Sequence, residues 1–286
     1  MIIVEIKGGL GNQMFQYALG YKLASMGKQI KYDISDYYRN GRNLRKLSLG
    51  IFDLELPVAN ENELIKVGRG NSLLGKACRK VGIGKDKIYI EDIDKGYQPS
   101  VFEMDNIYLS GYWQSEKYFK NICAEILKIY KMPGAVMREN KELLAEIENT
   151  NSVSMHIRRG DYLNEQNRKI YGNICTEKYY NEALNMINKR MQNSKIYVFT
   201  DDPKWARKKF AKKDFYVVEA NLNRNDVNDL FLMSKCKANI IANSSFSWWA
   251  AWLNQNKNKI VVAPMKWFNN HETSEAICED WNRIEG

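Results

Sequence analysis

The sequence predicts an α/β protein built on parallel β-sheets, and three observations carry this prediction. The first thirty residues contain a strand pattern, a glycine-rich turn, a helical pattern and a second strand pattern in succession. In the second half, apolar β-branched runs alternate with helical patterns. Such alternation is typical of a parallel sheet with helices on both faces. The length of 286 residues suits one large domain or two ordinary ones.

The N-terminal elements can be taken in chain order. Residues 1–6 form an apolar strand pattern, and the turn GGLGNQ follows at residues 8–13. Apolar side chains at helical spacing predict a helix over residues 14–26, which Gly27 ends. Residues 29–34 predict the second strand.

The middle of the chain, residues 36–125, carries weaker patterns. Its glycine-rich stretch at residues 68–84 predicts a loop with one short basic helix, and residues 107–113 predict a strand. The sequence Lys-Met-Pro-Gly at residues 131–134 then interrupts the pattern before a polar helix predicted over residues 136–149. We place a domain boundary after this helix.

The two predicted domains comprise residues 1–149 and 150–286, and the second has the clearer pattern. Its strands are predicted over residues 153–157, 196–199, 215–218, 238–242 and 260–262. The helices between them are predicted over residues 176–191, 203–212, 226–236 and 246–255.

Composition excludes several classes of protein. Hydrophobic residues make up 44% and charged residues 27% of the chain, which is the balance of a globular protein. No run approaches the roughly 18 apolar residues of a membrane span, and the N-terminus lacks the features of a signal peptide. Five scattered cysteines without a C-x-x-C pair indicate reduced thiols and a cytoplasmic location. The net charge of +9 favours a nucleotide, a nucleic acid or an acidic lipid surface as partner.

No metal site is expected. The chain has two histidines, His156 and His271, which lie far apart in sequence, so a histidine-rich metal centre is excluded. Asp92-Ile93-Asp94 matches the D-x-D pattern of metal-dependent sugar transferases, but a three-letter match away from a strand end is expected to be accidental.

Three polar segments follow strands of the second predicted sheet. They are HIRRGDY at residues 156–162, TDD at residues 200–202 and NSSFS at residues 243–247. Parallel sheets bind ligands beyond the carboxyl ends of their strands. The sequence therefore predicts that these segments meet at one edge of the sheet.

Two of these segments suit an anion. The guanidinium groups of Arg158 and Arg159 match pairs of phosphate oxygens, although ordinary surface salt bridges are the alternative. Residues 243–247 open a helix, whose free N–H groups and dipole favour a phosphate. Simple N-capping is the alternative there.

The remaining polar signals are less specific. Asp201 and Asp202 could accept hydrogen bonds from a base or a sugar, or could cap a helix because Pro203 stands at a first helical position. The turn Gly8-Gly9-Leu10-Gly11 resembles a phosphate-binding turn but lacks the lysine and hydroxyl residue of a P-loop.

Taken together, the motifs resemble those of glycosyltransferase family 11, the α-1,2-fucosyltransferases. The segment at residues 156–162 resembles the family's H-x-R-R-G-D-Y motif, and GGLGNQMFQYA at residues 8–18 resembles its N-terminal motif. Residues 199–202 and 243–249 resemble its two other motifs, and GYWQS at residues 111–115 is similar to a segment of bacterial members. The resemblance extends from residue 1 to about residue 265 without a departure inside the motifs.

This resemblance implies a fold and a reaction. The fold is of the GT-B type, with two Rossmann-like domains facing each other across a cleft and GDP-fucose held mainly by the C-terminal domain. The reaction is an inverting transfer of L-fucose from GDP-β-L-fucose to the 2-hydroxyl of a galactose residue, in bacterial surface polysaccharide synthesis. A fucosyltransferase of another linkage and a non-catalytic nucleotide- or sugar-binding protein are the alternatives.

The resemblance also implies roles for single residues. Arg158 would contact the β-phosphate, His156 and Asp201 would recognise guanine, and residues 245–247 would hold the diphosphate. The N-terminal turn would border the fucose and the acceptor. The donor-binding residues expected on this basis are His156, Arg158, Arg159, Asp201, Asp202, Asn243, Ser244, Ser245, Phe246, Ser247, Trp248, Gly9, Gly11, Asn12 and Gln13.

The group that takes the acceptor's proton is left open. Asp161 lies three residues after Arg158, so it could act as the base or could orient an arginine of the same loop. A third alternative is that the phosphate leaving group takes the proton. We favour the orienting role for Asp161.

The expected partners follow from the same resemblance. They are GDP-fucose and a galactose-containing glycan acceptor, for which a lipid-linked form is left open. No cofactor is expected, because GDP-fucose is a co-substrate. No nucleic acid is expected as a partner, because no ladder of basic and exposed aromatic residues is visible. The expected location is cytoplasmic, with at most peripheral contact at the inner face of the plasma membrane.

Overall fold

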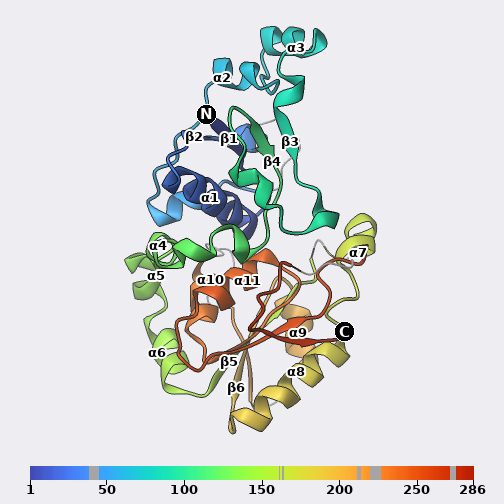
Figure 1. Ribbon diagram of the computed structural model, residues 1–286. Helices are drawn as coiled ribbons and strands as arrows, with labels where there is room; N and C mark the ends of the chain where they lie inside the picture. Colours follow the sequence, from blue (N-terminus) through green and yellow to red (C-terminus); the bar gives the residue numbers. More distant parts are fainter. Residues whose placement is uncertain (39–44, 161, 163, 211–213, 220–226, 271–274) are drawn as a thin grey trace. The chain divides into compact units, whose positions relative to one another are not determined.

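The computed structural model describes residues 1–38, 45–160, 162, 164–210, 214–219, 227–270 and 275–286. The chain divides into two compact units, Met1–Ile129 and Tyr130–Gly286, each with its own sheet. Every strand pair among the described residues is parallel, which confirms the predicted α/β class with two parallel sheets (Figure 1).

The N-terminal unit contains a four-stranded sheet in the order β2-β1-β4-β3. Its strands are β1 (Ile2–Glu5), β2 (Ile30–Asp33), β3 (Ile88–Ile90) and β4 (Tyr108–Ser110). Its α-helices are α1 (Leu10–Ser25), α2 (Glu61–Lys66), α3 (Leu73–Lys80) and α4 (Cys123–Ile129). The first unit of strand, helix and strand is thus as predicted, and α3 is the short basic helix expected in the glycine-rich stretch.

The C-terminal unit contains a six-stranded sheet in the order β10-β9-β8-β5-β6-β7. Its strands are β5 (Ser152–Ile157), β6 (Lys195–Thr200), β7 (Phe215–Val217), β8 (Ala238–Ile240), β9 (Ile260–Pro264) and β10 (Asn282–Ile284). Its helices are α5 (Gly134–Glu139), α6 (Lys141–Asn149), α7 (Glu165–Tyr171), α8 (Glu177–Arg190), α9 (Pro203–Lys209), α10 (Val227–Lys235) and α11 (Ser245–Leu253).

The central strands of the C-terminal unit, β5, β6, β8 and β9, form because most of their side chains are buried on both faces. All six residues of β5 are buried, and Val153, Met155 and Ile157 pack with Ala183 and Ile187 of α8. Helices cover the sheet on either side, as Figure 1 shows for α8 and α9 against α6 and α10. The sheet is therefore covered on both faces, as parallel sheets usually are.

The division between the units lies before the predicted boundary. The polar helix expected over residues 136–149 is present as α5 and α6, but both pack against α10, and α6 also packs against β5. The apolar side chains of α6, Leu144 and Ile147, are buried. These contacts join residues 130–149 to the C-terminal unit. Among the described residues, no helix is both long and apolar enough to cross a bilayer.

Candidate functional site

The order of strands places the three polar segments together at one edge of the C-terminal sheet. The chain moves from β5 to β6 in one direction and from β8 to β9 in the other, so the topology reverses between β5 and β8. Ligands bind at such a reversal, beyond the carboxyl ends of the strands. Arg158 and Arg159 follow β5, Asp201 follows β6, and Asn243 is the third residue after β8.

Arg158 and Asp201 form an ion pair at this edge. Nη1 of Arg158 lies 2.9 Å from Oδ2 of Asp201, and both side chains are partly exposed. The backbone N–H of Arg159 donates to Oδ1 of the same carboxylate at 2.9 Å. A Cβ on Gly160 would lie 2.6 Å from Oδ2 of Asp201, so a side chain at this position would have to displace that carboxylate. The loop after β5 is therefore fixed on the end of β6 by one carboxylate.

Arg159 is held by α9 instead. Its Nε lies 3.2 Å from Oδ2 of Asp202, and its guanidinium lies 4.1 Å from the ring centre of Trp205. Oδ1 of Asp202 accepts a hydrogen bond from the N–H of Trp205 at 3.1 Å, with Pro203 in the first helical turn. The capping interpretation of Asp202 is thus confirmed. This carboxylate positions both α9 and Arg159.

His156 is the second-last residue of β5, two residues before Arg158, and lies inside the sheet. It is 5% exposed, and its Nδ1 has no hydrogen-bond partner among the described residues. Burial and, to a smaller extent, the positive charge of Arg158 lower the pKa of the imidazole to about 4, against the weaker opposing effect of Asp201. The Phe246 ring lies 5.8 Å away, centre to centre. His156 is therefore a neutral imidazole with one buried nitrogen that no described residue pairs with.

The N-terminus of α11 supplies positive electrostatic potential at the same edge. Ser244 is the N-cap, but its side chain makes no capping hydrogen bond, and no acidic residue lies in the first turn of this fully described helix. Ser244, Ser245 and Phe246 are partly exposed. The first N–H groups of the helix can therefore receive an anion.

The predicted donor-binding residues Asn243, Ser247 and Trp248, at and before the start of α11, are buried and engaged within the protein. Asn243 donates to the carbonyl oxygens of Tyr171 and Trp267, and Ser247 Oγ donates to backbone carbonyl oxygens at the start of α11. Trp248 is fully buried, stacks on Trp252 and donates to the Ala276 carbonyl. We therefore assign these side chains to holding the backbone of the turn. Asp161 lies outside the described residues.

The N-terminal glycine-rich turn opens α1. Gly8 has a φ of +79°, a conformation that favours glycine, and Gly9 is the N-cap of the helix. Gln13 is fully buried: its Nε2 donates to the carbonyl oxygens of Gly8 and Lys46, and its Oε1 accepts from the N–H of Ser48. Gln13 thus holds the turn, whereas Asn12 is only partly buried.

Two segments of the resemblance meet in this unit. Gln114, in the segment after β4, donates to Oδ1 of Asn12 at 2.8 Å. The adjacent Trp113 is buried with a φ of +56°, which is uncommon for a bulky residue. The carboxylate of Glu91, just after β3, accepts the N–H groups of Tyr112 and Trp113 and so holds this turn. Burial raises the pKa of Glu91, against the opposing effect of these two hydrogen bonds.

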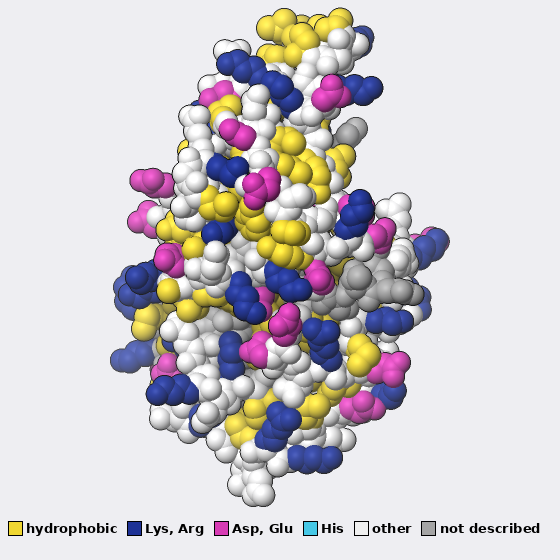
Figure 2. Space-filling view, viewed as in Figure 1, with side chains coloured by type: hydrophobic (Ala, Val, Ile, Leu, Met, Phe, Trp, Pro, Cys, Tyr) yellow, Lys and Arg dark blue, Asp and Glu magenta, His cyan; other side chains and the backbone are white. Residues whose placement is uncertain are grey.

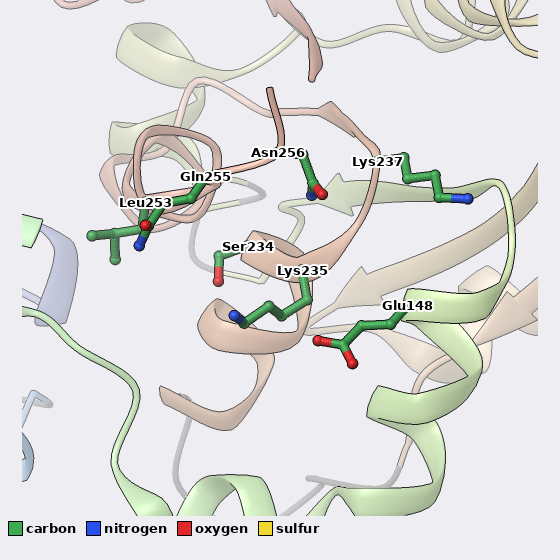
Figure 3. Close-up of a pocket in the computed structure, with 7 residues that line it drawn as sticks. All are labelled: Glu148, Ser234, Lys235, Lys237, Leu253, Gln255 and Asn256. Atoms are coloured by element: carbon green, nitrogen blue, oxygen red, sulfur yellow. The ribbon is translucent and has the colours of Figure 1, made fainter. Parts of the chain in front are cut away.

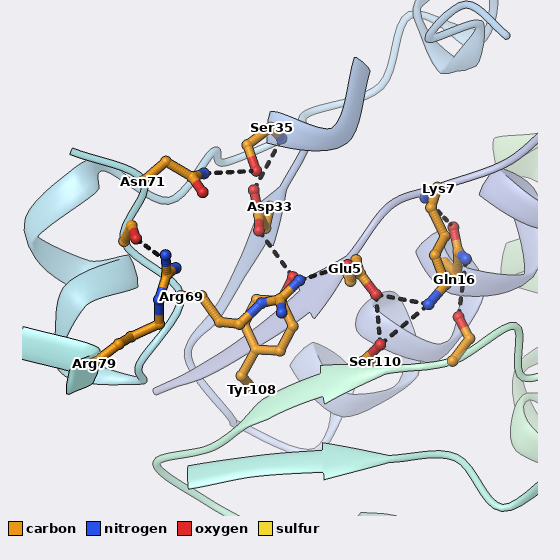
Figure 4. Close-up of polar contacts among 12 residues, drawn as sticks. Glu5, Lys7, Gln16, Asp33, Ser35, Arg69, Asn71, Arg79, Tyr108 and Ser110 are labelled. Atoms are coloured by element: carbon orange, nitrogen blue, oxygen red, sulfur yellow. Dashed lines mark hydrogen bonds and ion pairs between the residues drawn. The ribbon is translucent and has the colours of Figure 1, made fainter. Parts of the chain in front are cut away.

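A polar network beneath the turn was not predicted from the sequence (Figure 4). Glu5, the last residue of β1, pairs with Lys7 at 2.7 Å and Arg69 at 3.0 Å and accepts from Ser110. The hydroxyl of Tyr108 donates to Asp33 at 2.8 Å. Burial would raise the pKa of Glu5, but the two cations and the hydrogen bonds outweigh it and lower this pKa. The signal for Glu5 was a carboxylate inside an apolar strand.

A pocket of about 350 Å³ in the C-terminal unit lies away from these residues (Figure 3). Its lining comes from the ends of α6, α10 and α11 and from Lys237 just before β8. These positions lie at the amino ends of the strands, opposite the edge that carries Arg158 and Asn243. We therefore do not assign the donor site to this pocket.

Comparison with known proteins gives one family. Residues 93–285, about two thirds of the chain, match the family described as Glycosyl transferase family 11. The chain is 34% identical to the α-1,2-colitosyltransferase of Escherichia coli, covering 100% of this chain and 99% of the relative. It is 33% identical to the O-antigen biosynthesis glycosyltransferase WbnK of Escherichia coli, covering 96% of this chain and 98% of the relative.

A solved structure also resembles the chain. The NodZ α-1,6-fucosyltransferase soaked with GDP-fucose aligns with a TM-score of 0.47 at 12% identity, covering 88% of this chain and 91% of that one.

Proposed function

The chain belongs to glycosyltransferase family 11, and from this membership we propose that it transfers L-fucose from GDP-β-L-fucose to the 2-hydroxyl of a galactose residue. Membership confirms the family resemblance drawn from the motifs and makes the protein a glycosyltransferase. The observation that carries the donor assignment is that Arg158 and the N-terminus of α11, which the Ser244 side chain leaves uncapped, follow the neighbouring strands β5 and β8 at the reversal point of the C-terminal sheet.

The chemistry of the transfer needs positive charge at this place. As the bond between fucose and GDP breaks, the sugar acquires oxocarbenium character and negative charge develops on the β-phosphate. In our proposal Arg158 and the first N–H groups of α11 stabilise the negative charge on the β-phosphate. Arg159 is already held by Asp202 and Trp205, so it contributes to the local potential and fixes the loop.

We further propose that His156 and Asp201 recognise the guanine base. Nδ1 of His156 has no partner among the described residues, which leaves this buried nitrogen for a base. Asp201 pairs with Arg158 here, so its carboxylate can serve both the base and the arginine. Because Asp201 and Asp202 already position the two arginines, orientation does not require Asp161, whose role stays a prediction.

The N-terminal unit supplies the acceptor side in this proposal. Gly9 and Asn12 lie at the carboxyl edge of its sheet, where Gln114 reaches Asn12. Glycine at position 9 leaves open space, because a Cβ there would meet no other atom within 4 Å. The acceptor is a galactose-containing glycan, and we propose that the enzyme works in the cytoplasm at the inner face of the plasma membrane.

A donor screen tests the assignment. Purified protein with a β-galactoside acceptor should turn over GDP-fucose and leave UDP-sugars unused, and linkage analysis of the product should show an α-1,2 bond. The similarity to a colitosyltransferase favours GDP-colitose as a second candidate, a donor that lacks the 3-hydroxyl of fucose. A clear preference for GDP-colitose would replace fucose in the proposal but keep the reaction class. Turnover of UDP-sugars alone would refute it.

We expect transfer to continue in excess EDTA. Arg158 and α11 place positive potential where a metal would otherwise act, and the D-x-D match is part of a surface turn. There Asp92 Oδ1 accepts from the Asp94 N–H at 3.2 Å, and its Oδ2 lies 3.2 Å from Lys95 Nζ. Initial rates with and without EDTA should agree. Suppose instead that EDTA abolishes activity, and that manganese restores it in the wild type but not in Asp92→Asn. These aspartates would then be site residues.

A further inference from the structure

Helix α3 and the turn after it expose large hydrophobic side chains to solvent. Leu73 is 86% exposed, Leu74 64%, Val81 76% and Ile83 48%. Figure 2 shows hydrophobic side chains gathered over α3 with Lys and Arg side chains beside them. Single exposed hydrophobic residues are common, but a contiguous group of this kind marks an interaction surface.

The apolar side chains share one face of α3. At about 100° per residue, Leu73, Leu74, Ala77 and Val81 fall within an arc of about 100°. All four are exposed. A surface helix normally turns its apolar face to the core, so this helix has the reverse orientation.

The opposite face of α3 is the one that contacts the protein. Gly75 is buried so close to Gly70 that a Cβ on Gly75 would lie 2.6 Å from the Gly70 backbone. Nη1 of Arg79 donates to the Gly70 carbonyl at 2.7 Å. The N–H of Ser72 donates to Glu61 of α2 at 2.8 Å. The anchoring contacts thus fix the apolar face outward.

The turn after α3 is anchored as well. Gly84 has a φ of +77°, and a Cβ on it would lie 2.2 Å from the nitrogen of Gly68. The two glycines therefore join the two ends of the segment at residues 68–84. Val81 and Ile83, which lie just before this junction, remain exposed. The glycine-rich stretch thus builds a fixed projection with hydrophobic side chains.

Basic residues surround the hydrophobic ones. Residues 72–87 contain five basic residues and one acidic residue, a net charge of +4. The basic residues are Lys76, Arg79, Lys80, Lys85 and Lys87. A second copy of the chain would bring the same positive charge to this surface, which disfavours pairing with itself. An anionic surface complements it.

We propose that α3 and its following turn dock the N-terminal unit on an anionic lipid bilayer. Leu73, Leu74 and Val81 enter the boundary between headgroups and acyl chains, and the lysines pair with lipid phosphates. Each basic residue near such a surface strengthens binding by about fivefold. Docking places the acceptor-side unit next to membrane-bound glycan acceptors. This inference refines the proposed location and does not depend on the donor sugar.

Vesicle flotation with the full chain tests the proposal. Wild-type protein should float with vesicles made of equal parts phosphatidylglycerol and phosphatidylcholine, should not float with phosphatidylcholine alone, and should be released by about 0.5 M salt. Leu73→Ser with Leu74→Ser should lower binding more than about tenfold, and so should Lys76→Glu with Lys80→Glu.

Matched variants on the C-terminal unit serve as controls. Met137→Ser removes a side chain with 48% exposure from α5, and Lys204→Glu with Lys208→Glu reverses two exposed lysines of α9. Both should bind vesicles as the wild type does. Equal binding by the α3 variants, or equal loss in the controls, would overturn the proposal. So would a concentration-dependent dimer in sedimentation that Leu73→Ser with Leu74→Ser abolishes, because the surface would then pair two copies.

Transfer to a soluble galactoside separates this proposal from the proposed function. The α3 variants should keep wild-type turnover and melting temperature, because no α3 residue belongs to the donor site. Loss of vesicle binding with intact turnover supports docking alone. Docking without any sugar transfer would reject the proposed function and leave the membrane surface standing.

Discussion

Replacing Arg158 by Ala is expected to lower kcat for sugar transfer by about 10³-fold, with a smaller change in KM for the donor. Arg158 directly follows β5, and β5 lies beside β8, the strand that precedes α11. In our proposal the Arg158 guanidinium meets charge that develops on the β-phosphate only as the bond to fucose breaks. A contact that strengthens in the transition state affects kcat more than substrate binding. Steady-state kinetics with GDP-fucose and a soluble galactoside measure the effect.

Two further variants make this result specific. Arg158→Lys keeps the charge but loses the planar fork, so its rate should fall between those of wild type and Arg158→Ala. Arg190→Ala removes an exposed arginine at the end of α8 and should leave kcat unchanged. Because Arg158 pairs with Asp201, the melting temperature of each variant must be measured as well. A stable Arg158→Ala enzyme with near-normal kcat would remove Arg158 from the mechanism.

The sequence predicted the centre of the C-terminal sheet well because the central strands are mostly buried. β6 contains the continuous apolar run at residues 196–199, and β5 has the apolar residues Val153, Met155 and Ile157, so both stand out between helical patterns. The short strands β3 and β10 were not predicted, because each has three residues and only β3, Ile-Tyr-Ile, is apolar. β3 is partly exposed along its length, and β10 consists of Asn-Arg-Ile at the edge of its sheet. Their pairing depends on neighbours distant in sequence.

The candidate site was likewise predictable in part from the sequence. The meeting of the loops after β5, β6 and β8 could be predicted, because parallel strands bring their carboxyl ends to one edge. The partners of single side chains could not be predicted. Glu5 binds Arg69 and Ser110, which are 64 and 105 residues away, and Glu91 holds a turn 21 residues further on. Nothing in local sequence periodicity reports such pairs.

The burial of predicted site residues was equally invisible in the motifs. Gln13 and Trp248 belong to segments that resemble family motifs, yet both are fully buried. A motif shows that a residue type is needed at a position. It does not show whether the side chain contacts the ligand itself or supports the backbone that contacts the ligand. Hydrogen bonds from Gln13 to Gly8 and from Trp248 to Ala276 indicate the second role.

His156 is expected to make the protein less stable as the pH falls below about 6.5. Its pKa in the folded protein is about 4, below the ordinary value of 6.5, so the unfolded chain binds a proton more readily between these values. The contribution of the neutral imidazole to the free energy of unfolding is therefore fully present above pH 6.5. It declines as the pH falls toward 4. The resulting decrease in the free energy of unfolding is about 3 kcal/mol once the pH lies below both pKa values.

His156→Gln removes this titration but leaves the carboxylates that also respond to acid. We therefore expect the difference in unfolding free energy between wild type and His156→Gln to shift in favour of the variant as the pH falls from about 7 to about 4.5. Urea unfolding at several pH values measures this shift, and comparing pH values removes any constant cost of the substitution. The other histidine, His271, lies outside the described residues, and His271→Gln measured in parallel assigns the titration to one of the two. A wild-type imidazole that titrates near pH 6.5 by NMR, or equal pH dependence in wild type and His156→Gln, would contradict a neutral, buried His156 and with it the nitrogen that we assign to guanine.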